Sequence, residues 1–165
     1  MKTLEQHKKK IPDRNTALLK AQQYCAYQER CQQEVRDKLY DWGLHQQDVE
    51  QIIAALIEEQ FIQEERFAIL FAGGKFRIKK WGKIKIKTEL KRKKISNYCI
   101  KKALDAIEND TYIQVLEELL QKKSALNKEK NKYKRFSQIA AYAVSKGYEA
   151  ELVREILNKE DADFC

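Results

Sequence analysis

A dense run of basic side chains is the feature of this sequence that most clearly suggests interaction with a partner. Between residues 75 and 94, eleven basic residues stand against one acidic residue, Glu89. Such a run attracts polyanions and contacts nucleic acid mainly through its phosphates. Solvent-exposed faces usually mix both signs of charge, so a one-signed face predicts an anionic partner. The candidate binding residues are Lys75, Arg77, Lys79, Lys80, Lys83, Lys85, Lys87, Lys91, Arg92 and Lys93, and Lys94 completes the run.

Trp81 lies inside this basic run, beside Gly82. An indole ring there could stack on a base or dock into a protein pocket, which makes Trp81 a candidate aromatic contact. Packing into the core is the competing interpretation. For Trp42, which precedes a glycine at an expected helix corner, packing is the preferred interpretation.

The carboxylates offer little support for catalysis. Glu64 and Glu65 could be read as an acid/base pair, but carboxylates are also favoured in the first turn of a helix by its dipole. Glu89 is interpreted as an ion-pair partner of Lys85, Arg92 or Lys93. The sequence contains no nucleophile–base set and no phosphate-binding loop, so we expect no catalytic residues and no enzyme activity.

Metal and cofactor sites are not expected either. The cysteines, Cys25, Cys31, Cys99 and Cys165, form no CxxC pair, and the two histidines, His7 and His45, are far apart. The first residues lack the apolar core of a signal peptide, and no stretch is apolar for long enough to cross a membrane. We therefore expect a cytoplasmic protein with reduced thiols that has no membrane contact.

The charge is unevenly distributed along the chain. The net charge is +8, with a pI near 9.2. The 75–94 window alone nets +10, so the rest of the chain is slightly acidic overall. A second basic run between residues 122 and 135 has seven basic residues against Glu129.

The elements that must position these side chains are predicted to be helices. Apolar residues make up 43 % of the chain, with five glycines and one proline, which disfavours a turn-rich β fold. One apolar skeleton occurs three times, with anchors at Leu39, Leu90 and Ala143 that lie 51 and 53 residues apart. Each anchor has an apolar residue four positions before it and others five and ten positions after it: Val35, Leu44 and Val49; Ile86, Ile95 and Ile100; Ile139, Tyr148 and Val153.

Each skeleton breaks at a short corner, at 42–43, 93–94 and 146–147, where glycine suits a helix end. A further amphipathic helix precedes each corner unit: 16–27, with Leu18, Leu19, Ala21, Cys25 and Ala26 on one face; 64–72, with Phe67, Leu70 and Phe71; and 111–120, with Tyr112, Val115, Leu116, Leu119 and Leu120. The pattern predicts an all-α protein of nine helices in three tandem three-helix repeats, elongated and curved, and monomeric.

The expected boundaries are an N-terminal tail at 1–13, repeats at 14–60, 61–109 and 110–159, and an acidic C-terminal tail at 160–165.

The sequence departs from a regular helical pattern in two places. Residues 83–87 alternate strictly and could form a strand, but the repeat register places Ile86 and Leu90 on one helix face, so we expect a helix. Gly73 and Gly74 predict a kink or a weak point within a helix.

Two stretches resemble the RecX family of recombination regulators. The first, 56–68, contains an acidic-Arg-Phe-Ala sequence at the junction of the first two repeats. The second, 80–96, resembles a Gly-basic-X-X-Ile-X-X-Glu-Leu-X-X-basic-X-Ile pattern, with Gly82, Lys83, Ile86, Glu89, Leu90 and Ile95 at the matching positions. The resemblance covers about residues 14–158. Two departures are Lys94, where the family pattern is glycine-like, and the Gly73–Gly74 pair.

The resemblance implies three tandem three-helix repeats without a catalytic centre. It also implies binding in the groove of the RecA–DNA filament, which restrains the ATPase and strand exchange of RecA and so regulates recombination and DNA repair. Expected partners are the RecA filament and single- or double-stranded DNA, the latter through its phosphates. The alternative is a helix-turn-helix protein that binds duplex DNA alone.

Overall fold

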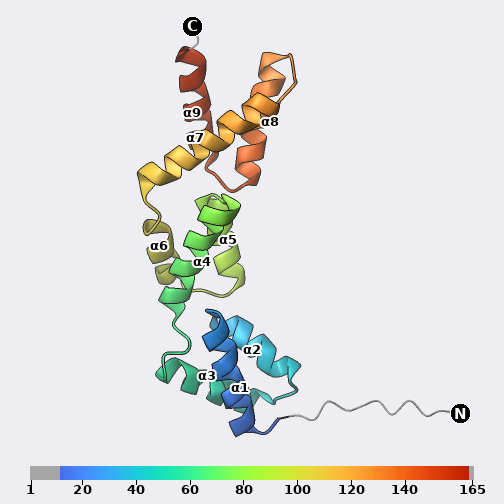
Figure 1. The fold of residues 1–165 in the computed structure, drawn as a ribbon, viewed down its shortest axis with the longest axis vertical. Helices are drawn as coiled ribbons and strands as arrows, with labels where there is room; N and C mark the ends of the chain where they lie inside the picture. Colours follow the sequence, from blue (N-terminus) through green and yellow to red (C-terminus); the bar gives the residue numbers. More distant parts are fainter. Residues whose placement is uncertain (1–11, 164–165) are drawn as a thin grey trace, which may run out of the picture. The chain divides into compact units, whose positions relative to one another are not determined.

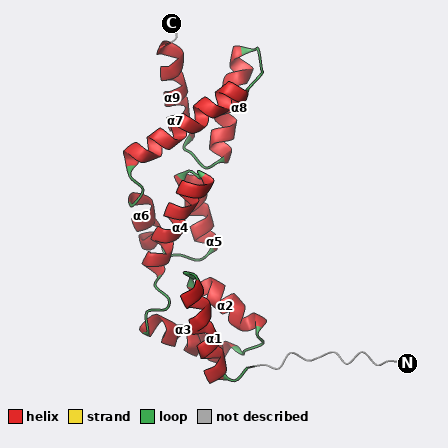
Figure 2. Cartoon of the chain, viewed as in Figure 1, coloured by secondary structure: helices red, strands yellow, loops and turns green. Residues whose placement is uncertain are grey.

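The computed structural model describes residues 12–163, and within this range every regular element is a helix (Figure 2). Nine helices occur there, in three successive groups of three. The prediction of an all-α protein built from three tandem three-helix repeats is confirmed. Of the predicted N-terminal tail, residues 1–11 lie outside the described range.

Repeat 1 consists of α1 (Arg14–Tyr27), α2 (Gln32–Asp41) and α3 (Gln46–Glu58), which pack on one another. α1 begins after Asp13, whose carboxylate accepts the backbone N–H of Thr16 at 2.7 Å. The apolar skeleton forms the core as predicted: Val35, Leu39, Val49 and Leu56 are fully buried. The predicted face of α1 is partly wrong, because Leu19 and Ala26 are exposed and Ala17 takes their place beside Ala21 and Cys25.

Repeat 2 consists of α4 (Glu64–Lys79), α5 (Lys83–Arg92) and α6 (Asn97–Asp105). The alternating 83–87 segment is helical, because only a helix places both Ile86 and Leu90 in the core, where each is 0 % exposed. α4 runs without interruption through Gly73 and Gly74. The missing side chain at Gly73 leaves room for the guanidinium of Arg77, whose Nη1 would lie 2.8 Å from a Cβ there.

Repeat 3 consists of α7 (Asn109–Leu126), α8 (Lys132–Ser145) and α9 (Ala150–Asp163), and α7 crosses the other two helices, which also pack on each other (Figure 1). Its core contains Leu116, Leu120 and Val153, all fully buried. α9 continues to Asp163, so residues 160–163 of the expected acidic tail are helical, and the end of that tail lies outside the described residues.

The three corners have the same backbone hydrogen bonds. In each, the residue after the corner donates its N–H to the anchor carbonyl: Leu44 to Leu39, Ile95 to Leu90 and Tyr148 to Ala143. The corner residue has a positive φ each time, at Gly43 (88°), Lys94 (58°) and Gly147 (99°). Lys94 therefore adopts the left-handed conformation that glycine provides in the other two repeats, and the corner geometry is kept.

The chain divides into two compact units, with the boundary after Phe67. Within the first unit, Arg66 fastens the start of α4 to repeat 1: its Nε lies 2.9 Å from the carboxylate of Glu29, and it donates to the carbonyl of Gln60 at 3.1 Å. These contacts give the arginine of the Glu-Glu-Arg-Phe sequence a structural role. The second unit contains repeat 3 and almost all of repeat 2.

Candidate functional site

The predicted basic residues lie on the last turns of α4, the 80–82 connection, α5 and the corner after it. Most of them extend into solvent, whereas Lys75, Lys83, Lys85 and Lys93 are half-buried. Glu89 pairs with Arg92 at 3.0 Å, which is one of the three partners expected for it. Glu89 is the one acidic residue against eleven basic residues in this run, so the ion pair leaves the run strongly positive.

Three of the half-buried lysines form a cluster with two aromatic rings, here called the cation–aromatic cluster: Phe71, Lys75, Trp81, Lys85 and Lys93. Lys75 Nζ lies 5.0 Å from the ring centroid of Trp81 and 5.3 Å from that of Phe71. Lys85 Nζ lies 4.6 Å from the Trp81 ring, and Lys93 Nζ lies 5.5 Å from the Phe71 ring. The rings hold three positive charges in defined places, because ammonium groups are attracted to aromatic faces.

Trp81 is therefore a half-buried residue whose ring makes cation–π contacts with Lys75 and Lys85. Its predicted role as a contact for a partner stays a prediction. Phe71, expected in the core, is half-buried and belongs to the cluster. The spacing of Phe71 and Lys75, one helical turn apart, was the available sequence signal for this contact.

The start of α5 is held by a contact with repeat 3, here called the corner junction. Gly82 N–H donates to the carbonyl of Lys146 at 2.8 Å, and Ile84 N–H donates to that of Gly147 at 3.0 Å. The two backbones are so close that a Cβ on Gly82 would overlap the carbonyl of Gly147. Gly82, the glycine of the family pattern, thus allows the 80–82 connection to touch the corner of repeat 3.

Tyrosines from repeat 3 complete the corner junction. The hydroxyl of Tyr112 accepts the backbone N–H of Lys83 at 3.0 Å and donates to Glu149 at 2.7 Å. Tyr148 donates to the carbonyl of Lys80 at 3.0 Å, and burial raises the pKa of Tyr148 to about 12. Lys83 Nζ lies 4.8 Å from the ring of Tyr112. The corner junction thus fixes four backbone positions of the basic run through hydrogen bonds to repeat 3, which the sequence did not predict. The positions are Lys80, Gly82, Lys83 and Ile84.

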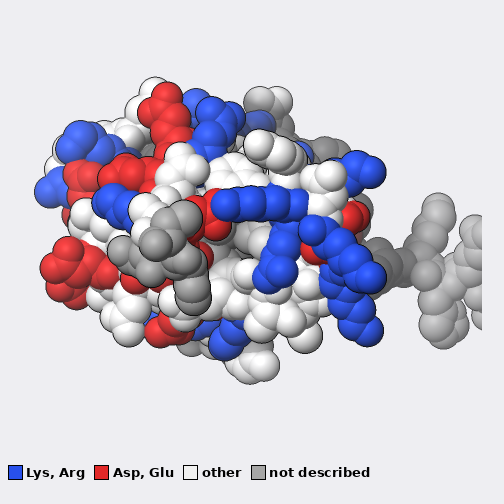
Figure 3. All heavy atoms as spheres, turned by 90° about the horizontal axis from the view of Figure 1, so that it is seen from above, with Lys and Arg blue, Asp and Glu red and all other residues white. Residues whose placement is uncertain are grey.

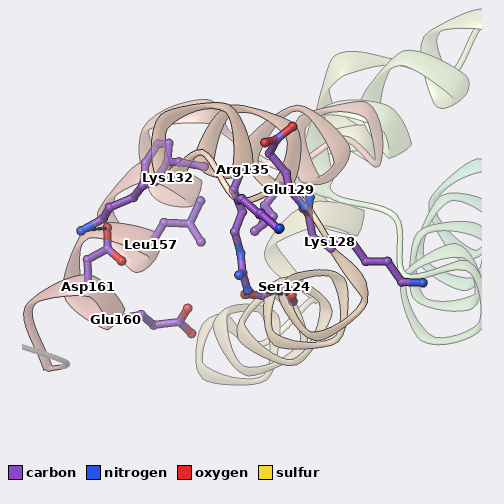
Figure 4. Close-up of a pocket in the computed structure, with 12 residues that line it drawn as sticks. Ser124, Lys128, Glu129, Lys132, Arg135, Leu157, Glu160 and Asp161 are labelled. Atoms are coloured by element: carbon purple, nitrogen blue, oxygen red, sulfur yellow. Dashed lines mark hydrogen bonds and ion pairs between the residues drawn. The ribbon is translucent and has the colours of Figure 1, made fainter.

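The second basic run has a different electrostatic setting. Four of its residues, Lys128, Lys130, Lys132 and Arg135, line a cleft of about 660 Å³ among α7, α8 and α9. Figure 4 shows Lys132 facing Asp161, at 3.7 Å, and Arg135 facing Ser124, to which it donates at 2.8 and 2.9 Å. Glu129 and Glu160 also line the cleft, and Figure 3 shows both signs of charge on the end of the molecule that it views. Acidic groups partly compensate the positive charge within this cleft.

The other chemical candidates occupy structural positions. Glu64 and Glu65 lie in the first turn of α4, and His45 is the exposed N-terminal cap residue of α3. Cys25, Cys31 and Cys99 are buried, and burial raises the pKa of the Cys25 thiol to about 11. Within residues 12–163, no group of three or more metal-ligating side chains is brought together. His7 and Cys165 lie outside the described residues.

None of the helices in the described part of the chain combines the length and apolar character that a membrane crossing requires.

Comparison with known proteins places all three repeats in one family. Residues 17–56, 64–104 and 110–157 match the models of the first, second and third three-helix domains of RecX. Proteins named regulatory protein RecX are similar: the one from Clostridium tetani is 33 % identical over 132 residues, and the one from Clostridium acetobutylicum is 29 % identical over 134 residues. Each alignment covers 79 % of this chain, which spans about 60 % of those relatives.

Solved structures agree on the fold. The crystal structure of RecX from Lactobacillus salivarius superimposes with a TM-score of 0.81 at 22 % identity, covering 91 % of this chain and 97 % of the other. A second crystal structure of regulatory protein RecX gives a TM-score of 0.78 at 19 % identity, covering 88 % and 73 %. With three consecutive domain models matched across most of its length, the chain belongs to the RecX family of regulatory proteins.

Proposed function

We propose that this protein binds the RecA filament on DNA and modulates RecA, restraining its ATPase and strand exchange and so regulating recombination and DNA repair. It acts by binding and not by catalysis. The observation that carries the proposal is the one-signed surface of α4 and α5 in a chain of the RecX family, with eleven basic residues against one acidic residue between residues 75 and 94.

The cation–aromatic cluster and the corner junction suit this surface to a rigid, regularly charged partner. Lys75, Lys85 and Lys93 are held over aromatic rings, so less side-chain entropy is lost when they meet phosphates or carboxylates. Arg77, Lys87 and Lys91 are exposed elsewhere on α4 and α5: Arg77 lies over Gly73, and Lys87 and Lys91 line a cleft with α6. Contacts of this kind read backbone charge and not base sequence, so binding should weaken steeply with salt.

The test is the ATPase rate of the cognate RecA on single-stranded DNA, titrated with this protein at fixed salt. We expect the rate to fall at substoichiometric ratios. A Lys83→Glu, Lys85→Glu, Lys87→Glu variant should keep native circular dichroism and lose both filament binding and the effect on the rate. If this variant binds normally, the surface of α5 is not the binding site.

The matched control is Lys128→Glu, Lys130→Glu, Lys134→Glu, which makes the same change in net charge within repeat 3. It should retain most of the effect, because acidic groups already compensate that region. An equal loss in both variants would mean that overall charge, and not the surface of α4 and α5, governs the interaction.

A second candidate, a protein that binds duplex DNA by itself, is favoured by one feature. The corner between α5 and α6 has a cleft of about 390 Å³ lined by Lys87, Lys91, Asn97 and Lys101, in the place where helix-turn-helix proteins present side chains to DNA. Tight duplex binding without RecA, together with an unchanged ATPase rate, would support this candidate against the filament regulator.

A further inference from the structure

α7 carries two apolar faces, although its repeat needs only one for its core. Tyr112, Leu116 and Leu120 face inward and are at most 2 % exposed. A second set, Val115, Leu119 and Leu126, recurs every four or seven residues along another side of the helix. Val115 and Leu119 are half-buried, and Leu126 is 78 % exposed. This second face is only partly covered by the packing of the repeat, and its exposure is greatest at Leu126.

The second face of α7 forms the floor of a groove against α8. The groove has a volume of about 360 Å³, and Tyr142 of α8 joins Val115, Leu119 and Leu126 in lining it. A neighbouring hollow of about 600 Å³ shares Lys123 and Leu126 with it and extends to the connection before α8. Apart from Leu126, this hollow is lined by polar residues, so the apolar floor belongs to the first groove.

The rim of the groove is strongly basic. Four lysines line it, whereas the only acidic side chain among its lining residues is Glu118, which accepts a hydrogen bond from Gln114 at 3.3 Å. Lys123 lies over the ring of Tyr142, with Nζ 4.5 Å from the centroid, and Lys146 donates to the carbonyl of Lys79 at 3.2 Å. The lysines are Lys80, Lys122, Lys123 and Lys146.

We propose that this groove binds an acidic amphipathic peptide segment of a partner protein, which lays its apolar side chains on the floor and its carboxylates on the lysine rim. An apolar floor with a rim of one charge matches a helix-in-groove interface with an oppositely charged ligand. Nucleic acid fits less well, because its phosphates would gain nothing from Val115, Leu119 and Leu126. The groove is separate from the cation–aromatic cluster. If the groove does not bind such a peptide, the proposed function of the α4 and α5 surface is unaffected.

The probe is a fluorescein-labelled peptide of about fourteen residues, with leucines three or four residues apart and mostly glutamates elsewhere. A scrambled peptide of the same composition and an oligothymidylate of similar length serve as reference ligands. We expect the patterned peptide to bind the full chain more tightly than either reference by about tenfold or more, with binding that weakens as salt is raised.

Two substitutions test the floor and the rim separately. Leu126→Ser and Lys122→Glu should each weaken peptide binding by about fivefold to tenfold. Their matched controls, Tyr133→Ser and Lys134→Glu, change equally exposed residues of the same repeat outside the groove and should leave binding unchanged. Circular dichroism checks that all four variants are folded.

Three results would overturn the proposal. Equal binding of patterned and scrambled peptides would show that charge alone is recognised. Equal effects of Leu126→Ser and Tyr133→Ser would show that the floor is not used. Competition by oligothymidylate, with loss of binding in Lys122→Glu but not in Leu126→Ser, would identify the groove as a nucleic-acid contact instead.

Discussion

Gly82 and Gly147, which lie far apart in the sequence, touch through their backbones where the 80–82 connection of repeat 2 meets the corner of repeat 3. A Cβ on Gly82 would overlap the carbonyl group of Gly147 and the backbone nitrogen of Tyr148. The contact also brings Gly82 N–H within 2.8 Å of the carbonyl of Lys146. Backbone groups cannot move aside as a flexible side chain can, so neither position of this pair tolerates a larger residue without displacing a corner.

Gly82→Ala should therefore lower the free energy of unfolding by about 2–4 kcal/mol, through overlap and the loss of the hydrogen bond to Lys146. Urea unfolding followed by circular dichroism measures the change. The control is Gly74→Ala, where a new Cβ would meet nothing within 4 Å inside α4. This substitution should instead stabilise the protein by roughly 0.5–1 kcal/mol. Equal effects at the two glycines would contradict the close contact.

The repeat architecture could be predicted from the sequence because the burial of each anchor depends on its own neighbours at helical spacing. Val35, Ile86 and Ile139 are all buried with their anchors, as the pattern requires. The same local signal resolved the 83–87 segment as a helix. On α1, the apolar residues Leu19 and Ala26 misled the prediction, because the small Ala17 faces the core beside Ala21 and Cys25, which were predicted correctly.

The proposed binding surface was predictable only in part. The basic run is visible in the sequence, but the groups that hold it come from elsewhere in the chain. Tyr112, Glu149 and Gly147 approach α5 through tertiary packing and have no spacing relation to it. Nothing near Lys83 in the sequence indicates that a tyrosine from repeat 3 caps its N–H. Long-range contacts of this kind follow from the packing of repeats and not from periodicity.

Lys94→Gly should stabilise the protein by roughly 0.5–1 kcal/mol. Lys94 has a φ of 58°, a conformation that is unfavourable for a residue with a Cβ and natural for glycine. The gain is partly offset because glycine has more freedom in the unfolded chain. Thermal unfolding measures the change.

The control for Lys94→Gly is Lys91→Gly, another exposed lysine changed to glycine inside α5, which should destabilise by about 1 kcal/mol. A loss of stability in Lys94→Gly would show that this corner does not need the left-handed backbone.

Tyr112→Phe should lower the free energy of unfolding by about 1–2 kcal/mol. The phenolic oxygen accepts the N–H of Lys83 at the start of α5 and donates to Glu149, so its removal leaves both groups without this partner. The ring contacts with Phe76 and Tyr148, with centroids 5.8 and 5.2 Å away, would remain. Tyr133→Phe, at a tyrosine that is 84 % exposed, should change nothing in the same chemical denaturation experiment.

Glu160→Gln should raise the free energy of unfolding at neutral pH and not at acidic pH. Burial raises the pKa of Glu160 above its ordinary value of 4.5; the hydrogen bond with Gln121 opposes this, and the nearby carboxylates of Glu117 and Asp161 add to it. Because the folded-state pKa is the higher one, the contribution of Glu160 to stability is fully present below pH 4.5. It is lost as the pH rises through the folded-state value.

At pH 7 the wild-type chain therefore contains the partly buried, charged carboxylate of Glu160. Glu160→Gln replaces it with an uncharged amide. The expected gain in Glu160→Gln is a few tenths of a kcal/mol, roughly, and it should vanish below about pH 4, where the glutamic acid is protonated in both states. Thermal unfolding across this pH range measures the gain in stability.

The control is Glu151→Gln, at an exposed position in the first turn of the same helix. It should give no gain, because the helix dipole favours a carboxylate there. A gain for Glu160→Gln that persists at low pH would contradict burial as the cause.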